Sequence, residues 1–417
     1  MASSSTSGTS GGGAAASGML NVLDFGAVAD GVTDCAAAMQ RAINQAQYEH
    51  RALQVPAGIY RVDSGLVVNT TQHSTGKYSP STQHWQVAPL RLLGEGSNNG
   101  GGESVIFAGQ PMAAVLTFAS RQPGTLSEMD EGNATTGHAV EQLTLDANEL
   151  ANFSAFAPAI WGAQWKSVSF RHGLIAGLYI GYGWIHTIED CAFKNNAVAN
   201  LYLDRAINAV NVLNNNFAAS AGVGIIANGG EALRIVGNCF QSLGGPAIYA
   251  NQMGALTISG SYYEGNNQRA ANYTWPGLPA GAANGGLCAE VVLNGAGNQT
   301  APGRWSELVW STNPARLGLL VEQGPAGGPR YVMAPQPLVD GNRFGSAIIE
   351  GSYHNPDQSQ CPGAQYYGVF VAGGEGISVR NNDCRACAKR HASRQCAVIG
   401  GGNVSGVDQA RNTGEWS

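Results

Sequence analysis

Two carboxylates stand beside aromatic residues, where they could carry out acid–base chemistry. Glu264 lies in the stretch SYYEGNN and directly precedes a long segment that carries several tryptophans, Trp275 among them. Tryptophans that wall a cleft exclude water from a carboxyl group, an environment that favours general acid catalysis. Asp204 follows Tyr202 by two residues and is the second catalytic candidate. The structural alternatives are a solvated turn glutamate at 264 and a turn-capping aspartate at 204.

Three tyrosines recur at one position of an internal repeat. Tyr179, Tyr202 and Tyr249 each follow the aromatic position of their repeat by nine residues, and Ile226 takes this place in the intervening repeat. Because they alternate with apolar positions, we predict that they face outward. An outward aromatic stripe can stack against sugar rings, and Trp275 could add to such a site. The alternative is burial against a neighbouring subunit or a covering loop.

A cysteine- and histidine-rich segment lies near the C-terminus. The spacing Cys384-x2-Cys387-x3-His391-x4-Cys396 supplies four side chains of the types that bind zinc. The module is one residue shorter than a zinc knuckle, and Cys361 could pair with one of these thiols. We therefore favour a disulfide-bonded or reduced segment, and expect no bound metal and no cofactor.

Composition excludes several classes of protein. The chain has 417 residues, of which only 12% are charged, and 58 glycines, which suits a β-rich fold with many turns. A net charge of −6 argues against a nucleic-acid partner, which needs a basic face. No apolar run approaches the length of a membrane span. Residues 1–18 predict a flexible tail and lack the features of a signal peptide.

A repeat of about 23 residues runs through the middle of the chain. Its aromatic positions are separated by 23, 24, 23 and 23 residues, and an apolar residue precedes each by five. Such a period predicts a solenoid in which equivalent residues stack. Asn215 and Asn238 share a further column and predict an asparagine ladder inside a turn. The aromatic positions are Phe170, Phe193, Phe217, Phe240 and Tyr263.

The segment before the repeat predicts a cap for the end of the solenoid core. In DFGAVADGVTD, Val22–Leu23 indicates a strand, while the aspartates favour turns and a helix start. A helix is predicted over residues 34–47, with Met39 and Ile43 on its apolar face. A turn and a strand, VPAGIYRV, follow at 55–62.

This pattern resembles the N-terminal cap of the pectate-lyase-like right-handed β-helix superfamily, which includes phage tailspikes, polygalacturonase relatives and alginate epimerases. The resemblance covers residues 21–62 and implies an all-β, single-stranded right-handed parallel β-helix with an N-terminal capping helix. The polygalacturonase, alginate-epimerase and calcium pectate lyase signatures are not found, and His172-Gly173 is only a weak match to the first. The resemblance therefore implies the fold and a broad class of carbohydrate chemistry.

The sequence thus predicts a polysaccharide depolymerase of tailspike type, either a glycoside hydrolase or a polysaccharide lyase. The alternative is a non-catalytic structural or adhesive β-helix of a virion or cell surface. The expected partner is a polysaccharide or cell-surface glycan, the expected location is extracellular or virion-associated, and a homotrimer is the assembly considered. The predicted divisions are a tail (1–18), a cap (19–65), a β-helix (66–400) with insertions at about 265–343, and a C-terminal tail (401–417).

Overall fold

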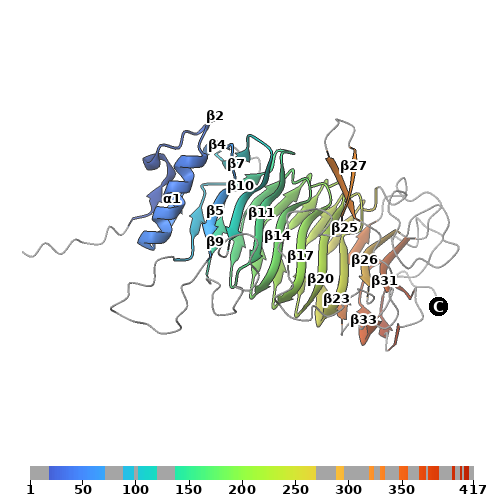
Figure 1. Cartoon of the computed structure of the whole chain (residues 1–417). Coiled ribbons are helices and arrows are strands. Elements are labelled where there is room, and N and C mark those ends of the chain that lie inside the picture. The colour runs from blue at the N-terminus through green and yellow to red at the C-terminus, as the bar shows by residue number, and fades with distance from the viewer. Residues whose placement is uncertain are drawn as a thin grey trace, which may run out of the picture.

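The computed structural model shows a chain wound into a parallel β-helix, with strands stacked from the capping helix towards the C-terminal end (Figure 1). It describes residues 18–70, 88–97, 102–119, 137–268, 288–294, 319–323, 329–333, 347–355, 366–371, 374–384, 397–399, 404–405 and 408–412. Within these residues, three parallel sheets hold 12, 10 and 10 strands, and most turns of the solenoid contribute one strand to each sheet in order. The predicted fold class is confirmed.

Sheet A and sheet B carry the short strands of each turn. Sheet A comprises β1 (Leu20–Asn21), β3 (Leu53–Gln54), β6 (Arg91–Leu93), β9 (Ala139–Glu141), β12 (Gln164–Lys166), β15 (Thr187–Glu189), β18 (Asn211–Leu213), β21 (Arg234–Val236), β24 (Leu256–Ser259), β29 (Ala347–Glu350), β33 (Ile377–Arg380) and β36 (Asp408–Ala410). Sheet B comprises β2 (Asp30–Asp34), β4 (Gly58–Val62), β7 (Ser104–Ala108), β10 (Thr144–Asp146), β13 (Ser169–Arg171), β16 (Ala192–Lys194), β19 (Asn216–Ala218), β22 (Cys239–Gln241), β25 (Tyr262–Glu264) and β30 (Tyr353–Asn355).

Sheet C carries the longest strands. It comprises β5 (Leu66–Asn69), β8 (Met112–Ala119), β11 (Ala151–Ala159), β14 (Ala176–Trp184), β17 (Ala199–Asn208), β20 (Val223–Glu231), β23 (Ile248–Gly254), β26 (Cys288–Asn294), β31 (Tyr366–Val371) and β34 (Ala397–Ile399). Two small pairs lie outside the three sheets, β27 (Leu319–Gln323) with β28 (Pro329–Met333), and β32 (Gly374–Glu375) with β35 (Val404–Ser405).

An aromatic stack fills the interior along sheet B, as the repeat predicts. Phe193, Phe217 and Phe240 are fully buried and lie parallel, with ring centroids 4.7 and 4.8 Å apart. These separations match the spacing of neighbouring strands, so each turn places its ring directly over the last. The stack extends from Phe170 through Tyr263 to His354. The predicted column Ile188, Val212, Ile235 and Ile258 is also in register, on sheet A.

The predicted asparagine ladder is present between sheets A and B. The backbone N–H of Cys191 donates to Asn215 Oδ1 at 2.8 Å, and that of Asn215 donates to Asn238 Oδ1 at 2.8 Å. The buried amides thereby satisfy the backbone N–H groups that the turn leaves without a strand partner. The same column continues through Ser261, Ser352, Asn382 and Asn412.

The N-terminal cap contains the predicted helix, shifted by two residues. Helix α1 spans Ala36–Glu49, and Asp34 Oδ1 accepts a hydrogen bond of 2.9 Å from the Ala36 N–H. Met39 and Ile43 are 1% exposed and join the core. The predicted strand at Val22–Leu23 is wrong: Val22–Phe25 forms a 3₁₀ helix, because the side chain of Asn21 accepts from Leu23 N–H and caps it.

Two further boundaries follow from the strand pairing. The prediction that a tail begins at residue 401 is wrong, because β36 pairs with β33 and extends sheet A. In the cap, β1 pairs with β3, so sheet A begins before the first full turn of the solenoid. Among the described residues, no helix combines the length and apolar character needed to cross a membrane.

We expect Ile43→Asp to open the capped end of the core. The substitution places a charge where α1 packs on the solenoid, so the helix must detach and expose apolar side chains and strand edges. Light scattering should show aggregation, and the melting temperature should fall. Tyr48→Asp on the same helix is the control, because Tyr48 is 69% exposed. Unchanged solubility and melting of Ile43→Asp would contradict the capping role.

Candidate functional site

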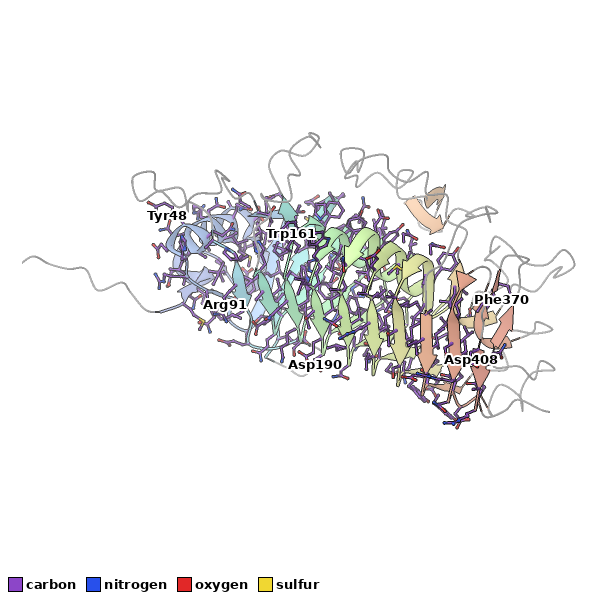
Figure 2. All side chains as sticks on the ribbon, turned by 90° about the horizontal axis from the view of Figure 1, so that it is seen from below. Tyr48, Arg91, Trp161, Asp190, Phe370 and Asp408 are labelled. Atoms are coloured by element: carbon purple, nitrogen blue, oxygen red, sulfur yellow. The ribbon has the colours of Figure 1, made fainter. Side chains whose placement is uncertain are left out.

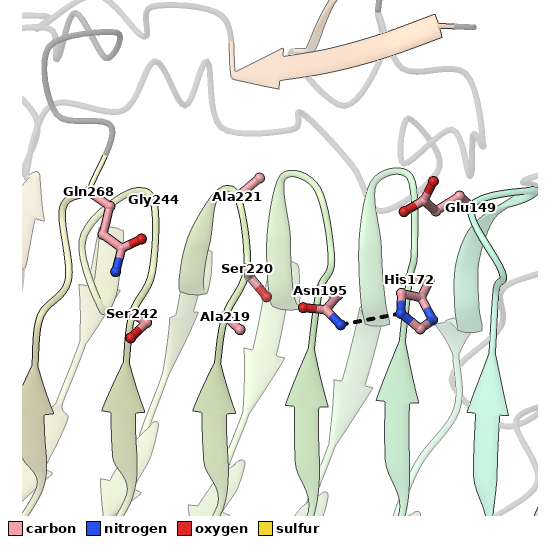
Figure 3. Close-up of a pocket in the computed structure, with 9 residues that line it drawn as sticks. All are labelled: Glu149, His172, Asn195, Ala219, Ser220, Ala221, Ser242, Gly244 and Gln268. Carbon is pink, nitrogen blue, oxygen red and sulfur yellow. Dashed lines mark hydrogen bonds between the residues drawn. The ribbon is translucent and has the colours of Figure 1, made fainter. Parts of the chain in front are cut away.

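A polar trough lies on the turns that lead from sheet B to sheet C. Its volume is about 410 Å³, and it runs across successive turns of the solenoid (Figure 3). One end holds titratable side chains, and the middle is lined by small residues. The lining residues are Glu149, His172, Asn195, Ala219, Ser220, Ala221, Ser242, Gly244 and Gln268.

The backbone of the repeat builds this trough. The first turn residue after β13 and after β16 adopts a left-handed conformation, with φ of 58° at both His172 and Asn195. This conformation bends the chain sharply and is repeated at Ala219 and Ser242. At Gly244 an added Cβ would overlap the carbonyl oxygen of Ala221, so the close packing of neighbouring turns requires glycine there.

An ion pair occupies the polar end of the trough. His172 Nδ1 lies 2.8 Å from Asp146 Oδ1, and Nε2 lies 3.2 Å from Asn195 Nδ2. The hydrogen bond with Asp146 raises the pKa of His172 above its usual value. Burial opposes this rise, and the charges of Asp146 and Glu149 add to it. The raised pKa favours the protonated imidazole, which can donate a proton, and the Asp146 carboxylate on the preceding turn holds the ring in its orientation.

A second charge pair lies beside the first. Arg171 Nη2 is 3.4 Å from Glu103 Oε2, and both side chains are only 14% exposed. Arg171 also donates from Nε to Ser169 Oγ at 2.8 Å. Adjacent turns thus bring three carboxylates, an imidazole and a guanidinium together, which we call the acid–histidine cluster (Glu103, Asp146, Glu149, Arg171 and His172). Within the described residues, no group of side chains is arranged to bind a metal ion.

Glu264 lies on the same side of the solenoid but far from this cluster. It ends β25, and its Oε2 accepts a hydrogen bond of 3.0 Å from Gln241 Nε2. Four steps of strand pairing separate Glu264 from Arg171, which corresponds to about 19 Å. Its partners in register are the amide residues Gln241 and Asn355. A catalytic role for Glu264 stays a prediction, and it would act on a different bond from His172.

Asp204 lies within β17 on sheet C, so the prediction of a turn position is wrong. Strand β17 continues to Asn208, so it is longer than the apolar pattern of the sequence indicates. Tyr179 Oη donates to Asp204 Oδ2 at 2.9 Å, and Asn228 Nδ2 donates to Tyr202 Oη at 3.0 Å. The structure therefore joins Asp204 to the tyrosine column, but places it on a different sheet from Glu264. Its catalytic role stays a prediction.

The tyrosine column is in register as predicted, but it is not an exposed stripe. Tyr179 pairs with Tyr202, and Ile226 with Tyr249, yet the tyrosines are only 2–3% exposed. Together with Phe156 they belong to an apolar cluster separate from the core. Alternation identifies the face of a strand but does not reveal whether that face is covered, which is why the predicted exposure is wrong. Their predicted sugar-binding role is not tested by burial alone.

Some of the other residues that the sequence predicts for a site lie outside the described part of the chain. Trp275 is among these, as are Cys387, His391 and Cys396 of the cysteine-rich segment. Cys384 is 2% exposed and disulfide-bonded. A cysteine in a disulfide has no thiolate to offer, so one of the four potential zinc ligands is removed.

The acid–histidine cluster was not predicted as a site. In the sequence, His172 belongs only to a weak His-Gly motif, and no pattern points to Asp146. Alignment of Leu145 with Phe170 would have placed Asp146 beside Arg171 on neighbouring strands, as the structure does. This signal is obscured because the step from Leu145 to Phe170 is 25 residues, two longer than the common period.

Solved structures share the fold at low sequence identity. ORF18 of Geobacillus virus E2 aligns with a TM-score of 0.48 and 12% identity, over 94% of this chain and 60% of that one. Pre-mature gene product 12 of bacteriophage phi29 aligns with a TM-score of 0.52 and 14% identity, over 94% of this chain and 52% of that one. The A-module of Azotobacter vinelandii mannuronan C-5 epimerase AlgE6 gives 0.43 and 16%, over 94% and 99%.

The chain thus spans about three fifths of the first of these proteins and half of the second. No curated protein sequence matches it. The family model of rhamnogalacturonase A/epimerase, pectate lyase-like proteins matches residues 19–249, which is more than half of the chain. The chain therefore belongs to the rhamnogalacturonase A/epimerase, pectate lyase-like family.

Proposed function

We propose that this protein is a polysaccharide depolymerase of tailspike type, a glycoside hydrolase or a polysaccharide lyase, that acts in the trough. The observation that carries the proposal is the acid–histidine cluster, where His172 is 2.8 Å from Asp146 at one end of a polar trough. Membership of a pectate lyase-like family supports carbohydrate as the substrate class.

The cluster has the parts that glycosidic bond cleavage requires. Protonated His172 can donate a proton to a leaving oxygen, and Asp146 stabilises the imidazolium and holds the ring in position. Glu149 is exposed in the trough and can accept a proton, either from water in a hydrolase or from the sugar in a lyase. Arg171 on the neighbouring strand supplies positive charge for a developing anion.

The remaining expectations follow as part of the same proposal. The partner is a polysaccharide or cell-surface glycan, and the protein is extracellular or virion-associated. The structural likeness to a bacteriophage gene product supports the virion as the location. Assembly as a homotrimer belongs to the proposal as well.

One observation favours a non-catalytic adhesive or structural β-helix as the second candidate. The two basic side chains of the acid–histidine cluster are already paired, Arg171 with Glu103 and His172 with Asp146. Ion pairs of this kind also occur where charges only stabilise a turn.

We expect His172→Asn to lower depolymerase activity by about 10² to 10⁴-fold, the usual contribution of a general acid or base. Asparagine tolerates the left-handed backbone, so the turn should remain intact. Activity should be measured on a panel of bacterial polysaccharides, from released reducing ends and from the ultraviolet absorbance of the unsaturated product of a lyase. His50→Asn is the matched control, because His50 is exposed and has the same φ of 58°.

The pH profile separates a catalytic His172 from a structural one. Because the pKa of His172 is raised, wild-type activity should persist above pH 6.5 or so, which is the ordinary pKa of histidine, and should fall at higher pH.

The variant Glu264→Gln tests the other catalytic candidate, and Asp190→Asn is the control at an exposed turn. Full activity of His172→Asn, with loss in Glu264→Gln, would move the chemistry to Glu264. Absence of cleavage on every polysaccharide by the wild type would favour the adhesive candidate.

A further inference from the structure

The outer face of sheet A carries two straight columns of side chains. Along this sheet a buried residue such as Trp165 stands between two residues of the same strand that point outward. Strand pairing joins the outward residues into one column that starts at Arg91 in β6 and a second that starts at Leu93. The columns cross ten strands and end at Asp408 and Ala410 in β36. Figure 2 shows Arg91 towards the end of the solenoid that carries α1 and Asp408 near the opposite end, so this face extends along most of the molecule.

The charges in these columns are complementary between the two halves of the sheet. The midpoint of the ten strands lies between β18 and β21. A charge on one side of this midpoint has a counterpart of opposite sign at the same distance on the other side. The two remaining charges, Glu189 and Arg234, have the uncharged Ser259 and Asn211 as counterparts. The three complementary pairs are Lys166 and Glu350, Glu141 and Arg380, and Arg91 and Asp408.

These charges are accessible from solvent. Arg91, Lys166 and Asp408 are exposed. Within the described part of the chain, Arg91, Glu141 and Asp408 take part in no ion pair. Lys166 lies 3.4 Å from Glu189, and its side chain is still 52% exposed. The charges are therefore available to a second molecule.

We propose that a second copy of this chain binds to the outer face of sheet A, with the two solenoids antiparallel. The two copies are related by a two-fold axis that runs along the strands between β18 and β21. Rotation about this axis reverses the order of the strands and places each column opposite itself, so every charge of the three pairs faces its counterpart on the other copy. Each pair occurs twice, because a two-fold contact uses the same surface on both chains. Leu213 faces Val236 of the second copy at the centre.

The charges also select this register over the adjacent ones. If the axis moves onto β18, Glu141 faces Glu350 of the second copy. If it moves onto β21, Lys166 faces Arg380 instead. Like charges placed opposite each other disfavour a contact, so only the register centred between β18 and β21 joins opposite charges throughout.

The size of the face predicts a weak, salt-dependent dimer. Ten strands of about three residues cover a strip roughly 45 Å long and 10 Å wide. Two such strips bury roughly 900 Å², which is near the lower limit for specific interfaces. Because the contact is rich in exposed charges, salt screens it. The inference goes beyond the proposed function, and it differs from the homotrimer because a two-fold contact alone joins two chains.

The test is sedimentation equilibrium of the full chain over a hundredfold or so range of concentration, at about 0.05 M and about 1 M salt. We expect the wild type to dimerise at low salt and to do so at least about tenfold more weakly at high salt. Arg91→Glu and Asp408→Arg should each weaken the low-salt dimer by about tenfold, because two contacts become repulsive. Lys194→Glu is the matched control, since it makes the same change of charge on sheet B. Melting curves should show that each variant is folded.

Mixing the two weakened variants gives the decisive result. In a mixed dimer of Arg91→Glu with Asp408→Arg, opposite charges face each other at both contacts, so the mixture should associate as strongly as the wild type. Recovery cannot arise within one chain, because Arg91 and Asp408 are nine strand spacings apart, about 43 Å. A mass of one chain or of three for the wild type at every concentration would overturn the proposal. A mixture that associates as weakly as either variant alone would do the same.

Discussion

Lowering the pH from 7 to 4.5 is expected to destabilise the solenoid by several kcal/mol, because three imidazoles are enclosed in it as neutral groups. His138, His186 and His354 are 0–1% exposed. Burial lowers the pKa of His138 to about 3, of His186 to about 4 and of His354 to about 3. In the unfolded chain each titrates near 6.5 or so.

The direction follows from proton uptake. Below pH 6.5 or so the unfolded state binds protons that the folded state does not. The stabilisation is therefore fully present above that pH and is lost as the pH falls towards the folded-state pKa values of about 3 to 4. A pKa difference of one unit is worth about 1.4 kcal/mol, so each histidine can cost about 2 kcal/mol or more at pH 4.5. Urea unfolding at pH 7, 5.5 and 4.5 measures this loss.

The variant His354→Phe isolates one of the three groups. His354 lies 4.7 Å from Tyr263 at the end of the aromatic stack, so phenylalanine should continue the stack and reduce the acid-dependent loss by about a third. His50→Asn at the exposed end of α1 should leave the loss unchanged. An equal pH dependence in wild type and His354→Phe would show that His354 can be protonated in the folded state.

Phe217→Ala is expected to lower the free energy of unfolding by about 3 to 5 kcal/mol. Phe217 is fully buried between Phe193 and Phe240, and its ring contacts both neighbours along the axis. Its removal leaves a cavity that the adjacent turns cannot fill, because backbone pairing fixes their spacing. Urea titration at pH 7 measures the change.

Two further variants serve as comparisons for Phe217→Ala. Phe217→Leu keeps most of the volume and should cost clearly less than the alanine variant. Phe156→Ala, in the separate apolar cluster on sheet C, tests whether that cluster stabilises the fold as strongly. A loss below about 1 kcal/mol in Phe217→Ala would mean that the solenoid collapses around the gap, against the view of a rigid stack.

The features that repeat were predictable from the sequence, and those that depend on covering or insertion were not. Phe193 over Phe217 and Asn215 over Asn238 follow from the period alone, because a parallel solenoid places equivalent residues one above the other. The burial of Tyr202 depends on what lies over the outer face of sheet C, which spacing does not encode.

The acid–histidine cluster illustrates a second reason why a site cannot be predicted from the sequence alone. Its residues come from three successive sheet B turns, and the longer step between Asp146 and Arg171 hides that they are neighbours. Glu103 comes from still earlier in the chain and meets Arg171 only through the stacking of turns. A site assembled across turns therefore requires the exact number of residues in every turn, which strand pairing reveals and the sequence obscures.

The polar column that runs from Asn215 to Asn412 between sheets A and B bears on how such a protein changes over evolutionary time. From Cys191 to Asn238 and again from Ser261 to Asn412, the backbone N–H of one turn donates to a side-chain oxygen of the next turn, so successive turns offer each other the same groups. A duplication or deletion of one whole repeat therefore leaves matching surfaces at the joint. The length of the molecule is in this sense a modular trait that changes in units of one turn, while the trough and Glu264 belong to individual turns, and the distance between Glu264 and the acid–histidine cluster changes as turns are gained or lost.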